Sequence, residues 1–355
     1  MKAAVFRRCG GPEQIHLADV PRPEISQGQV LVEVRACALN YFDLLVLGGP
    51  APEGFPFPFW GGADIAGVVA EVGSAVKGFR RGHRVVVNPS LSCGRCEHCA
   101  AGEESLCLEY GILGDAAPGG LAEFVAVGED QLLHLPEGVP FERAAAAPVV
   151  FQTAWRALIS QARVRPGEDV LILGASGGVG TAAIQIAKLA GAKVFAVTSS
   201  AEKALAVRDL GADVALDRSR GDYWAELADR TGGRGVDVVL ENVGAATWKK
   251  SLESLAKGGR LVTYGRTTGR LGETDIWLLF WHQLRILGTT MASRKEYADV
   301  MKLVFDGRLH PVIDKEFPLD QAKAAYERLA SGEGFGKVVV GMGRRHAEKP
   351  SEPVP

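Results

Sequence analysis

The stretch Val170-Leu-Ile-Leu-Gly174-Ala-Ser-Gly-Gly-Val-Gly180-Thr-Ala-Ala-Ile-Gln-Ile-Ala187 decides the fold of this chain. It reads as a short apolar strand, a glycine-rich turn and an amphipathic helix. Gly177 lets the backbone approach an anion, and Gly180 lets the helix pack closely against the strand. The helix start offers free N–H groups and partial positive charge. A pyrophosphate of a dinucleotide is therefore expected on the turn, which consists of Ser176, Gly177, Gly178, Val179 and Gly180.

Strands and helices keep alternating after this turn. The expected strands are Lys193–Val197, Ala212–Leu216, Val236–Glu241 and Arg260–Tyr264, and the expected helices between them are Ala201–Leu210, Trp224–Asp229 and Ala246–Leu255. Short strands that are apolar throughout predict a parallel sheet covered by helices on both faces. Right-handed crossovers make this a doubly wound α/β fold of the Rossmann type, which Leu284–Leu287 is expected to close.

The first 150 residues differ from this region, because their sequence predicts mainly short β-strands. Val30–Ala36 alternates apolar and polar residues, and similar runs recur at Ile65–Val72 and Arg84–Val87 between Gly and Pro turns. We therefore expect a barrel-like or sandwich-like domain over 1–150 and the dinucleotide domain over 151–290. Residues 291–342 should return to the first domain, and 343–355 form a polar, Pro-rich tail that we expect to be mobile.

Overall composition indicates a globular protein of two domains. The chain has 355 residues, 47% hydrophobic and 23% charged, with a net charge of −2. No basic surface indicates nucleic acid or anionic lipid as a partner. The N-terminus does not resemble a secretion signal, and no apolar run is long enough to span a membrane. A cytoplasmic location is expected.

The end of the second predicted strand bears on the choice of cofactor. An acidic residue that binds the ribose hydroxyls of NAD is usual about 20 residues after the glycine turn. Here the chain reads Thr198-Ser199-Ser200-Ala-Glu-Lys203, so small hydroxyls and a nearby lysine favour the 2′-phosphate of NADPH. Ser199 or Ser200 can instead cap the next helix, with Lys203 solvated. Glu202 competes as a ribose contact but lies inside that helix.

Four cysteines crowd into fifteen positions as Cys93-Gly-Arg-Cys96-Glu-His-Cys99-x7-Cys107. In a chain without a secretion signal, this spacing indicates a metal site more than a disulfide framework. Four thiolates suit a tetrahedral Zn²⁺ and leave no position open for water or substrate, so the expected zinc is structural. An iron–sulfur cluster is the other reading of four cysteines. His98 is expected to be a bystander.

A β-rich domain with this four-cysteine lobe, followed by the dinucleotide domain, resembles the medium-chain dehydrogenase/reductase superfamily over Met1–Gly341. The resemblance implies a GroES-like catalytic domain and argues against an iron–sulfur cluster. Zinc-dependent alcohol dehydrogenases of that superfamily hold a second, catalytic zinc. The corresponding ligand positions here are Asn40, Ala63 and either Val149 or Val150. Alanine and valine cannot coordinate a metal, so a catalytic zinc of that kind is not expected.

The segments Ala-Leu-Asn40-x-x-Asp43 and Gly62-Ala-Asp64-x-Ala-Gly67 instead resemble the quinone and enone reductase branch, which transfers hydride from NADPH without a metal. The resemblance places Asn40 and Thr153 beside the nicotinamide. Tyr41 is a candidate acid or oxyanion donor, with a rim or core role as the alternative, and Asp43 is expected to order its loop. Asn242, Gly244 and Gly265 follow strands and should line the cofactor cleft, unless they are plain turn residues. Arg266 is a possible contact for the 2′-phosphate or the substrate.

The predicted function is NADPH-dependent hydride transfer to a small quinone or α,β-unsaturated carbonyl. An alcohol or aldehyde dehydrogenase whose metal is bound through Cys37 or Asp64 is the alternative, although Cys37 also fits a buried structural position. A non-catalytic, crystallin-like role is the third possibility. Pairing of Leu284–Leu287 with its copy predicts a homodimer, or a homotetramer built from it.

Overall fold

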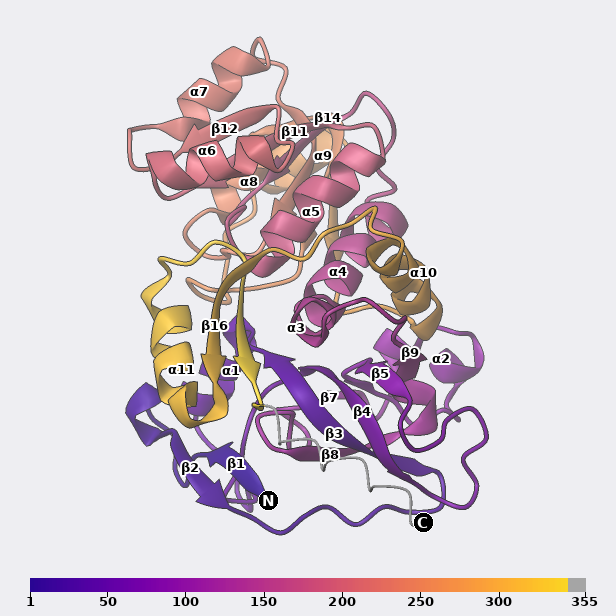
Figure 1. Ribbon diagram of the computed structural model, residues 1–355. Helices are drawn as coiled ribbons and strands as arrows, with labels where there is room; N and C mark the ends of the chain where they lie inside the picture. Colours follow the sequence, from indigo (N-terminus) through magenta and orange to yellow (C-terminus); the bar gives the residue numbers. More distant parts are fainter. Residues whose placement is uncertain (344–355) are drawn as a thin grey trace, which may run out of the picture.

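The computed structural model describes residues 1–343 and contains two large sheets with helices between and around them (Figure 1). Apart from Gly343, the tail predicted over residues 343–355 lies outside the described residues. The expected mixed α/β class, with a β-rich GroES-like part and a parallel Rossmann-type part, is confirmed.

The six-stranded cofactor sheet is parallel throughout and has the order β12-β11-β10-β13-β14-β15. Its strands are β10 (Asp169–Ile172), β11 (Lys193–Thr198), β12 (Val214–Asp217), β13 (Val236–Glu241), β14 (Leu255–Thr263) and β15 (Arg285–Gly288). Strand order reverses between β10 and β13, so a crevice opens at their carboxyl ends. The segment predicted as Leu284–Leu287 is the edge strand β15, as expected.

Both faces of this sheet are covered, which explains its apolar strands. Along β10, Val170 and Ile172 face one core cluster, and Leu171 faces the other. The first cluster includes residues of α4 (Pro148–Trp155), α5 (Gly178–Leu189), α6 (Ala201–Asp209) and α10 (Arg294–Phe305). The second includes residues of α7 (Tyr223–Arg230), α8 (Trp248–Glu253) and α9 (Ile276–Trp281).

A seven-stranded sheet forms the β-rich part, with the order β16-β17-β3-β4-β5-β9 and β8 paired to β3. Its strands are β3 (Gln29–Ala38), β4 (Asp64–Val72), β5 (Arg84–Val87), β8 (Phe124–Gly128), β9 (Leu132–His134), β16 (Ile313–Pro318) and β17 (Lys337–Gly341). β17 pairs antiparallel with β3, so the C-terminal segment returns to this seven-stranded sheet of the N-terminal part, as expected. The domain limits themselves stay a prediction.

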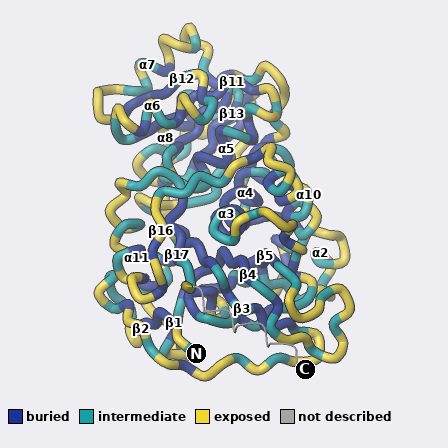
Figure 2. The backbone as a smooth tube through the Cα atoms, viewed as in Figure 1, coloured by how far each residue is buried: buried dark blue, intermediate teal, exposed yellow. Residues whose placement is uncertain are grey.

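Smaller elements complete the described chain. They are β1 (Lys2–Val5), β2 (His16–Asp19), α1 (Tyr41–Gly48), β6 (Ser90–Leu91), α2 (Glu97–Ala100), β7 (Gly111–Ile112), α3 (Phe141–Ala145), a π-helical turn at Arg156–Gln161 and α11 (Ala322–Ser331). Buried residues run without interruption from one sheet to the other through α3 and α4 (Figure 2). Among the described residues, none of the helices is long and apolar enough to cross a membrane.

Candidate active site between the two sheets

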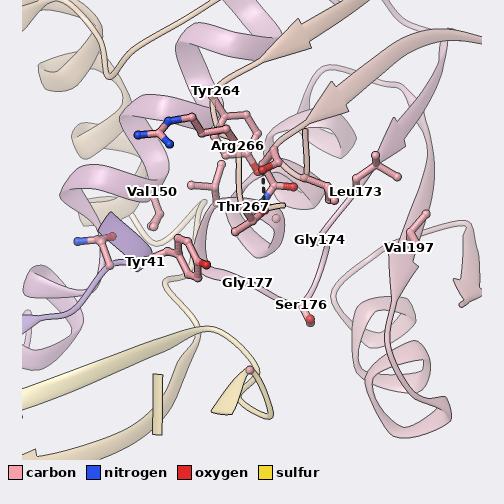
Figure 3. A pocket seen from close by; sticks show the side chains of 18 of the residues that line it. Tyr41, Val150, Leu173, Gly174, Ser176, Gly177, Val197, Tyr264, Arg266 and Thr267 are labelled. Carbon is pink, nitrogen blue, oxygen red and sulfur yellow. Dashed lines mark hydrogen bonds between the residues drawn. The ribbon is translucent and has the colours of Figure 1, made fainter. Parts of the chain in front are cut away.

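A cleft of about 1050 Å³ lies at the carboxyl edge of the six-stranded cofactor sheet, against the seven-stranded sheet and α1 (Figure 3). It brings together eleven of the residues predicted for catalysis and cofactor binding. These are Asn40, Tyr41, Thr153, Ser176, Gly177, Gly178, Val179, Gly180, Ser199, Asn242 and Gly265. Arg266, predicted as a phosphate or substrate contact, also lines the cleft, whereas Lys203 and Gly244 do not.

The glycine turn is built for close backbone contact. A Cβ on Gly180 would lie 2.4 Å from the carbonyl oxygen of Gly174 and 2.6 Å from the Cα of Ala175, so only glycine fits where α5 begins. Gly174 itself has φ +59°, in the left-handed region that glycine tolerates. The N–H of Gly336 donates to the carbonyl oxygen of Ser176 at 2.9 Å, which ties the turn to the segment before β17.

Polar atoms without partners mark where a ligand belongs. The Asn242 Oδ1, Tyr264 hydroxyl and Thr289 Oγ1 atoms are buried, and none has a hydrogen-bond partner among the described residues. All three residues line the cleft beside the glycine turn. Buried polar atoms of this kind are normally paired, so they indicate a polar ligand. Together with the turn, they fit a nicotinamide dinucleotide, whose ribose and amide groups can pair with them.

The far end of the cleft, beside β11 and β12, differs from what the sequence predicted. Lys203 does not line the cleft: its Nζ donates to the carbonyl oxygen of Gly332, a residue of the cleft wall, at 2.7 Å, and burial lowers the pKa of Lys203. Ser200 caps α6 by accepting from the N–H of Lys203, so this serine takes the capping alternative. Arg218, one residue past β12, lines the cleft beside Ser199 and forms no ion pair with any described residue. Sequence reasoning missed Arg218, although an arginine directly after a strand of such a sheet was a usable signal.

A buried cluster of Asn40, Asp64 and Lys337 forms the floor of the cleft near Thr153. Lys337 Nζ donates to Asp64 Oδ2 at 2.8 Å and also to Asn40 Oδ1, while Asn40 Nδ2 donates to the same carboxylate oxygen at 2.9 Å. Asp64 Oδ1 accepts from the N–H of Val149 at 2.7 Å. The Lys337 side chain is only 4% exposed and that of Asp64 is 0% exposed. No local sequence pattern marks Lys337 as a site residue.

Asp43 orders the start of α1, as expected. Its two oxygens accept from the N–H groups of Asn40 at 2.7 Å and Gly62 at 2.8 Å. Burial raises the pKa of Asp43 to about 6, against the lowering effect of these two hydrogen bonds and of Lys337. The carboxylate therefore holds the loop that presents Asn40 and Tyr41 to the cleft.

Apolar residues occupy two of the three positions at which the resemblance places the ligands of a catalytic zinc, namely Ala63 and either Val149 or Val150. Ala63 and Val149 are buried together with Met291, and Phe42, Tyr110 and Ile112 pack around them. Thr153 Oγ1 lies 3.7 Å from the sulfur of Met291. Tyr41 stands at the cleft wall with its side chain 47% exposed, so its hydroxyl is close to solvent.

The alternative metal ligands are already engaged. Cys37 is fully buried outside the cleft lining, and burial raises the pKa of its thiol well above the usual value. Both carboxylate oxygens of Asp64 accept hydrogen bonds in the cluster described above. A metal bound through Asp64 would first have to displace these hydrogen bonds, and a metal bound through Cys37 would lie outside the cleft lining.

The four-cysteine lobe is assembled as predicted. The ligand atoms of Cys93, Cys96, Cys99 and Cys107 all lie within 4.8 Å of one another, which fits a tetrahedral zinc site. Backbone N–H groups of Cys99 and Leu108 lower the pKa of Cys96 to about 6, whereas burial raises the pKa of Cys99 to about 12, so the arrangement of the four sulfurs, and not their titration, is what indicates the zinc site.

Ion pairs attach the lobe to the helices beside the cleft. Arg156 contacts Glu103 at 2.7 Å and Glu296 at 2.6 Å, and Arg294 donates to Ser92 at 3.0 Å. Tyr110 and Ile112, just after the last cysteine, pack beside Val149 at the cleft. The lobe therefore supports one wall of the site.

Known proteins resemble this chain over almost its whole length. The alcohol dehydrogenase GroES-like domain model matches residues 26–137, and the zinc-binding dehydrogenase model matches residues 178–306. The acryloyl-coenzyme A reductase of Sulfurisphaera tokodaii is 34% identical over 342 residues, which cover 96% of this chain and 99% of that protein. The quinone oxidoreductase of Homo sapiens is 30% identical over 349 residues, which cover 96% and 97%.

A solved structure described as an NAD-dependent alcohol dehydrogenase is 42% identical, with a TM-score of 0.92 over 97% of this chain and 100% of that one. This similarity in sequence and in structure covers nearly the whole chain, including the glycine turn, the cysteine lobe and the cleft between the two sheets. The chain is an oxidoreductase that belongs to the medium-chain dehydrogenase/reductase superfamily.

Proposed function

We propose that this protein is an NADPH-dependent reductase of carbon–carbon double bonds conjugated to a carbonyl, as in enones, quinones and enoyl thioesters, with one structural zinc and no catalytic metal. The observation that carries the proposal is the floor of the cleft. At the positions where the resemblance would place zinc ligands, this chain has Ala63 and either Val149 or Val150, and the Lys337–Asp64 ion pair lies near them.

The chain's own residues supply what this reaction needs. NADPH, when bound along the glycine turn, supplies the hydride. Addition of hydride at the β-carbon of the substrate leaves negative charge on its carbonyl oxygen. Asn40 has a second Nδ2–H for which no described residue provides an acceptor, and an amide donor fixed in this way stabilises such an oxygen. The Tyr41 hydroxyl, near solvent, can deliver the proton that the α-carbon then takes.

Arg218 and Ser199 support the preference for NADPH. A guanidinium beside a hydroxyl suits a phosphate monoester, and neither side chain repels it as a carboxylate would. The NAD-dependent description of one solved relative makes this preference a matter for direct measurement. Zinc held by four thiolates suits a reducing compartment, which supports a cytoplasmic location.

A screen of cofactor oxidation tests the proposal. Quinones, enones, enoyl thioesters, aldehydes and ketones are each offered with NADPH and with NADH, and zinc is counted in the purified protein. We expect turnover of at least one conjugated acceptor with NADPH and about one zinc per chain. Turnover confined to simple aldehydes and ketones, with two metals per chain, would instead support the alcohol dehydrogenase alternative.

The assembly that we propose is a homodimer, or a tetramer built from it, formed through β15 and α9. β15 is an edge strand of the cofactor sheet. α9 beside it exposes Ile276, Trp277, Phe280 and Trp281. An edge strand next to exposed aromatic side chains is typical of a surface that a second copy covers.

A further inference from the structure

We infer that Lys337 is a positioning residue, which holds and polarises the Asn40 amide so that its free N–H can stabilise the negative oxygen of the reduced substrate. This inference rests on the proposed reductase function. It adds a role for a buried lysine that lies 297 positions from Asn40 in the sequence.

The hydrogen bonds fix which way the amide points. Lys337 Nζ can only donate, so the Asn40 atom that faces it must be the oxygen. Asp64 Oδ2 can only accept while it is ionised, so the Asn40 atom that faces it must be the nitrogen. The orientation is therefore imposed by two charged neighbours. One N–H of the amide is engaged with Asp64, and the other is left for the cleft that Asn40 lines.

The charge on Lys337 also strengthens this donor. A cation hydrogen-bonded to an amide oxygen withdraws electron density from the nitrogen, and hydrogen bonds in such chains reinforce one another. The site is buried, so solvent screens this effect only weakly. Asp64 supplies the counter-charge to the Lys337 ammonium in this buried site, at 2.8 Å.

Lys337 is held in place from the cofactor side as well. A Cβ on Gly178 would lie 2.7 Å from Lys337 Cδ and 2.7 Å from a methyl group of Val150, so the lysine stem runs against the first residue of α5. Gly336, the preceding residue, donates to Ser176 in the glycine turn. The polarising lysine thus connects the pyrophosphate turn to the residue that faces the substrate.

A simpler role must be separated from this one. Lys337 could serve only to neutralise Asp64, and its loss would then damage the site without any effect through Asn40. A double-mutant cycle separates the two roles, because a residue that acts through Asn40 has little to lose once Asn40 is gone.

The experiment compares wild type with Lys337→Met, Asn40→Ala and the double variant, and uses the conjugated substrate found in the screen. The kcat values are measured with NADPH and with deuterated NADPH, so that the isotope effect shows whether hydride transfer is being measured. Cofactor Kd is measured by fluorescence. Lys315→Met, on the exposed face of the neighbouring β16, is the matched control and should behave as wild type.

We expect kcat to fall about 100-fold in Asn40→Ala and about tenfold in Lys337→Met, with the NADPH Kd changed less than about threefold. In the Asn40→Ala background, Lys337→Met should lower kcat by less than about twofold. An equal fall in both backgrounds would overturn the inference. Inactive wild type with every conjugated acceptor would instead overturn the proposed function, and the two failures are distinct.

Lys337→Met leaves a buried carboxylate unpaired and can prevent folding. The charge-neutral pair Asp64→Asn/Lys337→Met then takes its place. If Lys337 only neutralises Asp64, this variant should have a kcat close to that of wild type, and that result would refute the role assigned to Lys337. If Lys337 acts through Asn40, kcat of the pair variant stays about tenfold low, and restoring the lysine alone, in Asp64→Asn, raises kcat above that of the pair. An Asp64→Asn variant no faster than the pair would assign the loss to Asp64 and overturn the role of Lys337.

Discussion

At the scale of single residues, Arg218 is the side chain that should decide between the two cofactors. Its guanidinium lines the cleft beside Ser199, whereas the ammonium of Lys203 is engaged with Gly332. We predict that Arg218→Ala raises the Kd for NADPH about tenfold, because a charged hydrogen bond to phosphate contributes about 1.5–3 kcal/mol. The Kd for NADH should change less than about twofold. Both values can be measured by fluorescence titration.

Arg220→Ala is the matched control, since Arg220 is exposed in the same loop but does not line the cleft. An equal weakening of NADH and NADPH in Arg218→Ala would contradict the prediction. Loss of NADPH binding in Lys203→Met, with Arg218→Ala unaffected, would return the role to the lysine that the sequence indicated.

Asp43 should make the stability of the fold depend on pH. Its folded pKa of about 6 lies above the usual 3.8, so the folded state binds the proton more tightly than the unfolded chain. The corresponding stabilisation is fully present below about pH 4 and is lost as the pH rises through about 6. Asp43→Asn should abolish this contribution of about 3 kcal/mol.

Urea unfolding of wild type and Asp43→Asn at pH 5 and pH 8 measures the effect as the difference between the two proteins. The free energy of unfolding of wild type should fall more steeply with pH than that of the variant. Asp320→Asn, at an exposed position, should follow wild type. Parallel pH profiles for wild type and Asp43→Asn would show that the Asp43 carboxyl titrates normally.

At the scale of elements, the cysteine lobe is a metal-dependent support for the cleft wall. We predict that Cys99→Ser removes the bound zinc and lowers Tm by roughly 5 °C or more, because the lobe from Cys93 to Cys107 loses its main cross-link. Zinc content is measured by mass spectrometry and Tm by calorimetry. Cys9→Ser, outside the cluster, should keep one zinc per chain. Full zinc content in Cys99→Ser would exclude the four-thiolate site.

The sequence predicted most elements of the cofactor sheet to within two residues. β13 (Val236–Glu241) has the expected limits, because its apolar residues Val236, Val238, Val239 and Leu240 are preceded directly by Gly235 and followed by Asn242, so the local pattern marks both ends. β14 starts five residues before the expected Arg260, since Ala256-Lys-Gly-Gly259 resembles a turn but continues the strand through a bulge against β13. Local pattern alone could not show that pairing.

The residues of the site also differ in whether the sequence alone could predict them. Gly180 was predictable because its steric demand arises within one strand–turn–helix unit. Lys337 was not predictable, because a lysine at the start of the run Lys337-Val-Val-Val is typical of a solvated strand end. Only the pairing of β17 with β3 carries it into the interior beside Asp64. Contacts across the whole length of the chain leave no such local pattern.

At the scale of the whole molecule, α9 and β15 present a surface that a monomer would leave uncovered. Trp277 and Trp281 stack with ring centroids 5.8 Å apart, and Phe280 is 61% exposed. Aromatic side chains bury about 150–250 Å² each, so three of them with the adjoining edge strand approach the roughly 800 Å² per partner of a stable interface.

We predict that Phe280→Glu converts a dimer into a monomer, because two copies of a buried carboxylate would meet near the two-fold axis of a symmetric interface. Sedimentation velocity at micromolar concentration measures the change. Leu108→Glu, an equally drastic change at an exposed leucine of the cysteine lobe, should leave the dimer intact. NADPH binding should survive in both variants, since neither residue lines the cleft. Wild type that sediments as a monomer would show that this apolar face has no second copy as its occupant.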